Sequence, residues 1–431
     1  MPGTYPIALV IFTPSVMRDV DLVIVGGGPA GLSTALHLHA IAPALQIVVL
    51  ERERYPREKI CAGGIGARAF KLLAKIGVDV ECPKVPLTSL AVKLMHDTVV
   101  TRVDDLGAVV RRIEFDHALA KVAIARGIEL RDNCGVERIE MIDASDRAVG
   151  TQDDVIQGRA SSSDTARVRV ITASGDVYRA RAIVGADGVS GVVRHQAGFP
   201  RPELRAQVVE LDTEGVADDL PRDTVVFDFA RRDLAGYAWD FPTIVDGQPL
   251  VCRGAYVIRT LGADDARARC AAYLAERGLD IKRYRIKQFA ERGWEPGVDI
   301  AKPRVLLVGE AAGIDIATGE GIGQAIEYGS VAAPYLARAF EREDLSFGDW
   351  RRAVEKHHLG FQLRIRYLAY ELFYGRRRTK VEFLMPRLSS MFRVAVQDFA
   401  GVPISKLALA RGAGQFLAAY ATMKMRPDDV D

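Results

Sequence analysis

The chain has 431 residues, 49% of them hydrophobic and 26% charged, and its 58 Lys and Arg against 56 Asp and Glu give a formal net charge of +2. This balance does not favour nucleic-acid binding, which needs a clear positive excess. Five scattered cysteines without a CxxC pair, and seven histidines without metal-ligand spacing, predict neither a disulfide framework nor a metal site. No apolar run reaches the roughly 18 residues of a spanning helix. These features favour a cytoplasmic protein of two or three compact domains.

The first predicted elements follow an aperiodic stretch, residues 1–19, which we interpret as an N-terminal extension, with Met17 as the hypothetical natural start. Residues 18–25 are rich in Val and Ile and end in glycines, which predicts a buried parallel strand. A helix to about residue 40 and a second strand over residues 45–50 follow.

The turn between the first strand and the helix carries the pattern Gly26-x-Gly28-x-x-Gly31, and Glu51 ends the second strand 20 residues after Gly31. In this setting the glycines allow a tight turn, close approach to a pyrophosphate and close helix–strand packing. The helix N-terminus attracts phosphate, and the acid can accept from a ribose hydroxyl. We therefore predict a dinucleotide site.

Segments of alternating polarity predict further strands in the middle of the chain, at residues 136–142, 168–171, 177–180, 224–229 and 251–258. We expect them to include an antiparallel sheet inserted between parts of the nucleotide-binding domain. Residues 304–308 return to the buried-strand pattern and lead through Gly309-Glu310-Ala311-Ala312-Gly313 into a helix from about residue 321 to 338. This arrangement predicts a second approach to the cofactor.

The predicted fold class is α/β: a Rossmann-like nucleotide-binding domain with the GxGxxG turn, an inserted antiparallel sheet that forms a substrate domain, and a C-terminal helical region. We expect the nucleotide-binding domain at residues 20–80, 100–195 and 296–345, the substrate domain at residues 81–99 and 196–295, and the helical region at residues 346–431. From residue 351 to the end, 15 Lys and Arg face 7 Asp and Glu, so the C-terminal region is basic.

Three separated segments stand out together: residues 25–31 with Glu51-Arg52, residues 184–194 around Asp187-Gly188, and residues 309–322. With them the sequence resembles FAD-dependent oxidoreductases of the geranylgeranyl reductase family, within the wider fold of the para-hydroxybenzoate hydroxylase type. The match spans most of residues 20–340.

Two shorter matches favour the reductase branch of these proteins. Residues 59–64, with Cys61-Ala62-Gly63, are similar to the cysteine–glycine motif that follows the ribose-binding acid. Residues 237–242, Tyr-Ala-Trp-Asp-Phe-Pro, are similar to the aromatic motif that lines the substrate cavity.

The resemblance implies FAD as the cofactor. It implies that FAD is held by Gly26, Gly28, Pro29, Ala30, Gly31, Glu51, Arg52, Cys61, Ala62, Gly63, Arg112, Asp187, Gly188, Gly309, Glu310, Gly319, Gly321 and Ile322. It also implies a substrate cavity walled by Tyr237, Trp239, Phe241 and Pro242; strand alternation puts the three aromatic rings on one face. That face could equally be ordinary core, and Cys61 a small buried residue, with no sign that it is a nucleophile.

Two positions depart from the family pattern. Glu310 stands where relatives usually have aspartate, which keeps the charge but lengthens the reach by one methylene. Ile316 stands where relatives commonly have a proline near the flavin ring, so the local backbone can differ.

The resemblance implies reduction of a carbon–carbon double bond in a lipophilic or isoprenoid-like substrate, by hydride from reduced flavin. A proton must reach the other carbon, and Tyr237 and Asp240 are the candidate catalytic donors, although alternation turns Asp240 away from the aromatic face. No second strand-linked dinucleotide motif appears, so NAD(P)H would dock transiently or a reduced carrier protein would supply electrons.

Two alternatives remain open. The first is an FAD-dependent monooxygenase that hydroxylates an aromatic or apolar substrate; halogenation is disfavoured because the tryptophan–x–tryptophan–x–isoleucine–proline signature is absent. The second is a flavin electron-transfer protein at a membrane surface. Residues 359–374 are apolar with interspersed arginines, and Arg376-Arg377-Arg378-x-Lys380 follows, which could contact an anionic membrane peripherally. The competing interpretation is a helical cover over the substrate cavity.

Overall fold

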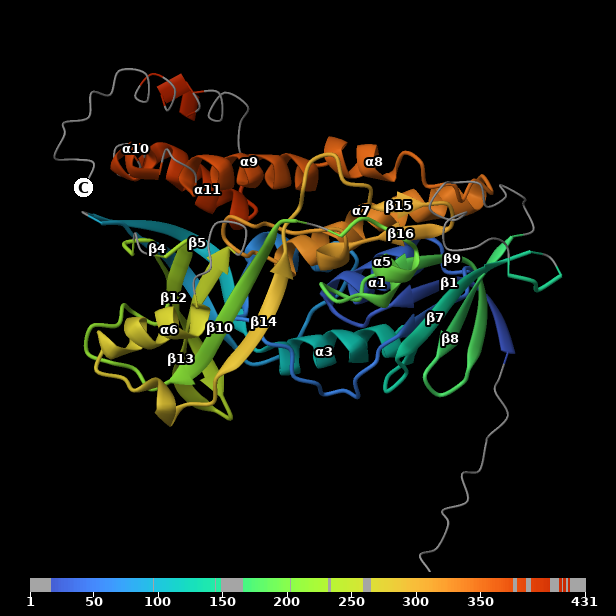
Figure 1. Ribbon diagram of the computed structural model, residues 1–431, viewed down its shortest axis with the longest axis horizontal. Coiled ribbons are helices and arrows are strands. Elements are labelled where there is room, and N and C mark those ends of the chain that lie inside the picture. The colour runs from blue at the N-terminus through green and yellow to red at the C-terminus, as the bar shows by residue number, and fades with distance from the viewer. Residues whose placement is uncertain are drawn as a thin grey trace, which may run out of the picture.

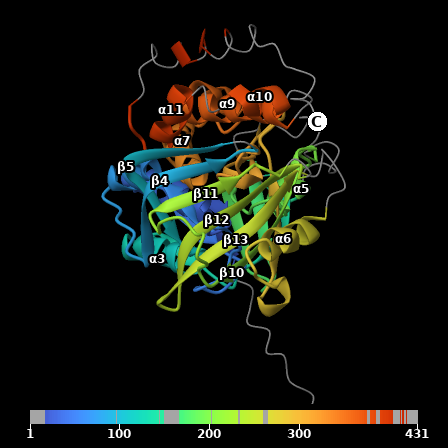
Figure 2. The same ribbon diagram turned by 90° about the vertical axis from the view of Figure 1, so that its left-hand side faces the viewer.

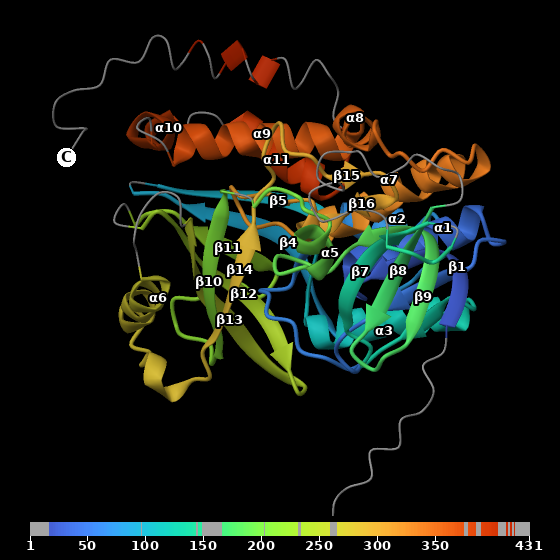
Figure 3. The ribbon, with the colours of Figure 1, turned by 45° about the vertical axis from the view of Figure 1, so that its right-hand side comes forward.

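The computed structural model shows two eight-stranded β-sheets side by side, with helices packed over them (Figures 1 and 3). The predicted α/β class is confirmed. The structure describes residues 17–95, 97–143, 145–148, 166–201, 203–231, 234–258, 265–374, 378–384 and 389–403, and five positions between 411 and 418.

The first sheet has a parallel core in the order β16-β9-β1-β2-β6, and β7 and β8 extend β9 in antiparallel fashion. Its strands are β1 (Met17–Val25), β2 (Ile47–Leu50), β6 (Glu129–Arg131), β7 (Val136–Ile142), β8 (Arg167–Thr172), β9 (Val177–Gly185), β15 (Ala301–Lys302) and β16 (Val305–Leu307). The parallel strands are Val-, Ile- and Leu-rich because they are buried on both faces.

Helices α1 (Pro29–Ile41) and α7 (Ile322–Glu341) pack closely against one another beside this sheet. The Ser33 hydroxyl donates to the Ile326 carbonyl at 2.7 Å. Gly329 permits this approach, since a Cβ there would lie 2.4 Å from the Ser33 hydroxyl. The close packing brings the N-termini of two helices to the carboxyl ends of the parallel strands.

The second sheet runs in the order β14-β10-β13-β12-β11-β4-β5-β3 and is antiparallel except for the parallel pair β11 and β4. Its strands are β3 (Gly64–Gly66), β4 (Lys84–Lys93), β5 (Thr98–Val110), β10 (Arg205–Thr213), β11 (Thr224–Asp228), β12 (Gly236–Val245), β13 (Gln248–Ile258) and β14 (Lys287–Arg292). Helices α2 (Ala67–Ala74) and α6 (Ala266–Ala275) pack against it, and the short turn η2 (Ile281–Arg283) lies beside α6. Helices α3 (Arg112–Ala125) and α5 (Val192–Gln196) pack against the first sheet, and the short turn η3 (Gly309–Ala311) contacts α1, α7 and β14.

The second sheet takes in more of the chain than the sequence-based boundaries gave it. We expected the nucleotide-binding domain to resume at residue 100, but β5 stays in the second sheet to Val110. The cause is the β4–β5 hairpin, whose ladder continues from the Lys93–Thr98 pair to the Lys84–Val110 pair with one irregularity. This hairpin pairing keeps both ends of β5 in the second sheet.

The C-terminal helices lie across the top of the molecule, above the second sheet (Figures 1 and 2). They are α8 (Trp350–Lys356), α9 (His358–Phe373), α10 (Arg378–Leu384) and α11 (Ser389–Phe399). Tyr370 and Phe373 of α9, with Val381 and Val396, join the same apolar cluster as the aromatic side chains of the sheet. The helical region therefore closes one face of the second sheet.

Within the described ranges, no helix is both long and apolar enough to cross a bilayer. No group of three or more His, Cys, Asp or Glu side chains in the same ranges is placed to hold a metal ion.

Candidate functional site

The turn between β1 and α1 depends on two glycines for its shape. Gly26 has φ +105°, and a Cβ on Gly31 would lie 1.9 Å from the Gly26 carbonyl oxygen. Pro29 is the first residue of α1, a position where its missing N–H costs nothing. The turn is thus closed against the helix.

The space beside Gly28 is open and faces two cations. A Cβ on Gly28 would lie 3.7 Å from Nη2 of Arg112 and 3.8 Å from Nη2 of Arg57. Buried Asp116 holds both guanidinium groups, with Arg112 Nε at 2.7 Å and Arg57 Nη1 at 3.0 Å. A helix N-terminus with two fixed arginines attracts an anion, so the site fits the pyrophosphate of a dinucleotide.

Glu51 ends β2 as predicted and lies in the same site. Its carboxylate accepts from the Gly27 N–H at 2.8 Å and faces Arg57 at 3.3 Å. Arg52, in contrast, is exposed and pairs with Glu53 at 3.4 Å. Glu51 therefore lies beside the turn of residues 26–31, here called the phosphate turn, and Arg52 lies at the surface.

The second motif, residues 184–194 around Asp187, and the third motif, residues 309–322, lie against each other. A Cβ on Gly188 would lie 3.6 Å from Oε2 of Glu310. Asp187 Oδ2 accepts from the Val193 N–H at 3.0 Å, whereas Asp187 Oδ1 and Glu310 Oε1 are buried and have no hydrogen-bond partner among the described residues. Burial raises the pKa of Asp187 to about 6 and also raises that of Glu310. Two such acceptors suit the hydroxyl groups of the cofactor's sugar chain.

The third motif also reaches the first motif and the second sheet. Gly309 has φ +59°, and a Cβ there would lie 2.5 Å from that of Ala30 in α1. Gly321 precedes buried Ile322 at the start of α7. Gly319, with φ +68°, packs against the second sheet. The three motifs therefore converge where the two sheets meet.

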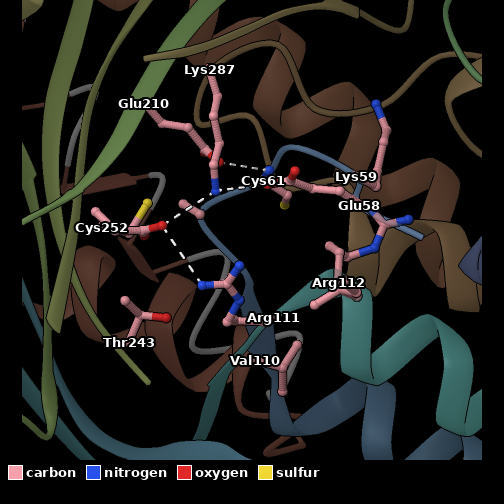
Figure 4. Close-up of a pocket in the computed structure, with 13 residues that line it drawn as sticks. Glu58, Lys59, Cys61, Val110, Arg111, Arg112, Glu210, Thr243, Cys252 and Lys287 are labelled. Atoms are coloured by element: carbon pink, nitrogen blue, oxygen red, sulfur yellow. Dashed lines mark hydrogen bonds and ion pairs between the residues drawn. The ribbon is translucent and has the colours of Figure 1, made fainter. Parts of the chain in front are cut away.

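The Cys61 loop closes the other side of this seam (Figure 4). Its Cys61 N–H donates to Glu210 Oε1 of β10 at 3.1 Å, and the Gly63 N–H approaches the Cys61 sulfur at 3.4 Å. Burial raises the pKa of the Cys61 thiol to about 11, so at neutral pH it is a neutral thiol rather than a reactive thiolate.

A cavity of about 20 Å³ lies between this loop, β10, β13 and the start of α3, and Ala62 and Arg112 are among its lining residues. Lys287 crosses its mouth between Glu58, at 3.0 Å, and Asp212, at 3.3 Å. A wider groove of about 630 Å³ between α2 and the β4–β5 hairpin is lined by none of the motif residues.

The aromatic motif occupies β12 with the predicted alternation. Tyr237, Trp239 and Phe241 all belong to the apolar cluster beneath the C-terminal helices. Tyr237 stacks on Tyr256 of β13 at 5.0 Å between ring centroids, and its hydroxyl donates to the Thr318 carbonyl at 2.5 Å. This face of the sheet therefore meets the Gly319 loop.

Asp240 and Pro242 alternate with these rings and lie on the opposite face of β12. Asp240 pairs with Arg253 at 2.7 Å and Arg277 at 3.0 Å, and accepts from the Tyr273 hydroxyl at 2.8 Å. This buried ionic cluster lies against α6, on the far side of the sheet from the Gly319 loop. A proton-donor role for Asp240 does not fit this position.

Several site residues were missed from the sequence. Arg57 and Asp116 complete the phosphate turn, and buried Glu210 and Glu291 line the second sheet's side of the seam. Asp116 follows Arg112 by four positions in the sequence, but no role was predicted for it. Arg57, Glu210 and Glu291 have no motif of their own.

A family model described as an FAD binding domain matches residues 19–231, which contain the phosphate turn, the Cys61 loop and the Asp187 segment. This chain is a flavoprotein. The resemblance to FAD-dependent oxidoreductases of the geranylgeranyl reductase family is confirmed by its relatives.

The relatives of the flavoprotein include three proteins that match most of their own length. An uncharacterized protein of Methanosarcina barkeri is 26% identical and covers 83% of this chain and 85% of its own. The menaquinone reductase of Mycobacterium tuberculosis is 24% identical, with 75% and 78% covered. Digeranylgeranylglycerophospholipid reductase 1 of Methanococcoides burtonii is also 24% identical, with 77% and 78% covered.

Two solved structures show that the flavoprotein's fold is shared by different chemistries. A geranylgeranyl bacteriochlorophyll reductase-like protein from Thermoplasma acidophilum superposes with a TM-score of 0.63 at 17% identity, over 94% of this chain and 98% of its own. The flavin-dependent brominase Bmp2 superposes with a TM-score of 0.64 at 16% identity, over 94% and 100%. At such identities the likeness is one of fold.

Proposed function

We propose that this flavoprotein reduces a carbon–carbon double bond in a lipophilic, isoprenoid-like substrate. The aromatic face of β12 carries the proposal, because it turns Tyr237, Trp239 and Phe241 toward the loop of the third motif and is covered by α9. Apolar walls with few polar groups suit such a substrate. The names of the reductase relatives support the same class of reaction.

In this proposal the chain's part is to bind, orient and exclude water. Arg57 and Arg112 would hold the pyrophosphate of FAD, Glu51 its ribose, and Asp187 and Glu310 its sugar hydroxyls. Bound FAD would supply the hydride. We propose NAD(P)H or a reduced carrier protein as the source of electrons.

The test is an anaerobic half-reaction. The reduced holoprotein is mixed with an unsaturated isoprenoid quinone or a polyprenyl lipid, and with the fully saturated analogue as a matched control. The proposal expects oxidation of the flavin by the unsaturated compound alone, and a product heavier by two hydrogens in mass spectrometry. Flavin oxidation that needs oxygen and yields a hydroxylated product would instead establish the monooxygenase.

We further propose that α9 contacts an anionic membrane surface, where such a substrate would reside. Phe361, Ile365 and Leu368 form an exposed apolar stripe on α9, with exposed fractions of 43%, 49% and 52%. Exposed Arg364, three positions after Phe361 and four before Leu368, flanks it. These spacings put apolar and cationic side chains on one surface, as in interfacial helices.

The basic run after α9 lies only in part within the described residues. Arg376 and Arg377 lie outside the described residues, and Arg378 donates to the carbonyls of Leu234 and Phe229 at 2.9 and 3.0 Å. Flotation with vesicles containing phosphatidylserine, at low and high salt, tests the contact. Binding that Ile365→Glu abolishes is expected, and absence of binding at either salt concentration contradicts it.

A further inference from the structure

Glu291 is a buried acid whose carboxyl group faces the seam between the sheets. It lies near the end of β14, and 9% of its surface is exposed. Its Oε2 atom is buried without a hydrogen-bond partner among the described residues. An unpaired buried carboxyl oxygen costs free energy, so a fold that retains one calls for an explanation.

The carboxyl group lies beside the third motif and the aromatic face. A Cβ on Gly319 would lie 3.0 Å from Glu291 Oε2, 3.2 Å from the Tyr237 hydroxyl and 2.8 Å from the Tyr256 ring. Glycine at this position therefore lets the third motif approach an acid and two tyrosines at once. Glu291 thus lies where the loop of the third motif meets the aromatic face of β12, the proposed wall of the substrate cavity.

The surroundings of Glu291 favour its protonated form. Burial raises its pKa well above the ordinary value, and the nearby Glu310 carboxylate raises it further, while Lys59 opposes the shift. The titratable groups that face it from the packed elements are Glu310, Lys59, Asp315, Glu210, Tyr237 and Tyr256. These surroundings favour the protonated form of Glu291, which can give its proton away.

Three other groups on or near the second sheet are engaged elsewhere. Asp240 lies in the ionic cluster on the far face of the sheet, and the Tyr237 hydroxyl already donates to Thr318. Glu320 pairs with Arg366 at 2.6 Å. Among these acidic groups, Glu291 combines a free oxygen with contact to the loop and the aromatic wall.

We propose that Glu291 is the acid that supplies the proton in the double-bond reduction. The inference rests on the proposed function. Two C–H bonds replace the π bond: one is made with the hydride that reduced FAD contributes, and the other with the proton from the Glu291 carboxyl. The carboxylate that remains then regains a proton from solvent before the next turnover.

The test compares Glu291→Gln with Glu295→Gln, a matched control. Glu295 lies four residues further along and accepts from the Leu204 N–H at 3.2 Å, a bond that glutamine can keep. Infrared spectra of both proteins, with and without FAD, should show that Glu291→Gln alone loses a protonated carboxyl band. Retention of every such band in Glu291→Gln would overturn the proposal.

The kinetic arm uses the anaerobic half-reaction. In Glu291→Gln, oxidation of the reduced holoprotein by the unsaturated substrate should slow by about 10²- to 10⁴-fold. FAD affinity and reduction by dithionite should stay unchanged, and Glu291→Asp should recover part of the rate. Equal rates in Glu291→Gln and wild type overturn this inference alone, whereas a wild type that reduces no alkene overturns the proposed function as well.

Discussion

Gly28 and Gly31 lie three positions apart in one turn but are needed for different reasons. A Cβ on Gly28 meets only the arginine tips at 3.7 and 3.8 Å, whereas one on Gly31 meets a backbone oxygen at 1.9 Å. We predict that Gly28→Ala leaves the unfolding free energy of the apoprotein within about 1 kcal/mol of wild type but weakens FAD binding by at least about tenfold. The added methyl would occupy the space for the pyrophosphate.

Gly31→Ala should instead destabilise the apoprotein itself, by about 2 kcal/mol, because the methyl group cannot fit without moving the backbone. Urea unfolding of the apoprotein and quenching of FAD fluorescence measure the two effects separately. Tight FAD binding by Gly28→Ala would mean that the phosphate does not approach the turn at this position.

Asp240 is predicted to be a stability residue. Arg253 is fully buried and pairs with Asp240 and Asp219, so Asp240→Asn removes one of two compensating charges from a desolvated cation. The expected loss is about 3 kcal/mol in the free energy of unfolding. Flavin oxidation by substrate, measured on the folded protein, should keep its wild-type rate; a hundredfold loss would contradict the structural assignment.

A single residue can be predicted from the sequence where its role depends on neighbours a few positions away. The glycine turn and the alternation of Tyr237, Trp239 and Phe241 follow from periods of a few residues. Arg57 and Glu291 could not be found this way, because each acquires its partners through packing of segments far apart in the chain. Arg57 joins Glu51 of β2 to Asp116 of α3, and Glu291 meets the loop that contains Gly319.

Helix α9 connects the loop of the third motif to the other C-terminal helices. Arg366 pairs with Asp315 and Glu320 of the loop, each at 2.6 Å. At its start, His358 lies between Glu327 of α7, at 3.0 Å, and Asp398 of α11, at 2.9 Å. One imidazolium thus joins three helices.

The His358 contacts predict a pH-dependent attachment of α9. Burial lowers its pKa, but the hydrogen bonds with Asp398 and Glu327 outweigh burial and raise it to about 9, from 6.5. The stabilisation is therefore complete below pH 6.5 and is lost as pH rises through about 9. We expect a loss of about 1–2 kcal/mol, smaller than the full shift because the side chain is partly exposed. Hydrogen exchange of α9 and α11 from pH 6 to 9.5 measures it, and His358→Gln should remove the dependence.

Element-level prediction from sequence succeeded for several strands and for the helices beside the glycine motifs, and failed for sheet membership. No strand was predicted over β5. Its place in the second sheet comes from pairing with β4 and β3, and β3 lies more than 30 residues away in the chain. Such pairings depend on long-range packing, which a period of two residues does not encode.

For the whole molecule, the seam between the sheets makes stability depend on pH and on FAD. Burial raises the pKa of Glu210 to about 7, from 4.5, and that of Asp187 to about 6, from 3.8. The folded apoprotein binds these protons more tightly than the unfolded chain, so its unfolding free energy should fall as pH rises from about 4 through 7, by an amount on the order of 3 kcal/mol. The His358 contribution declines mainly above pH 6.5, at the upper end of this range.

Urea unfolding at pH 5 and 7 measures the loss. Glu210→Gln should remove much of it, since glutamine keeps the bond from Cys61 without ionising. Saturating FAD should reduce it too, because sugar hydroxyls that donate to Asp187 and Glu310 favour their charged forms. An apoprotein whose stability rises between these pH values would show that the seam carboxyls are ionised without FAD.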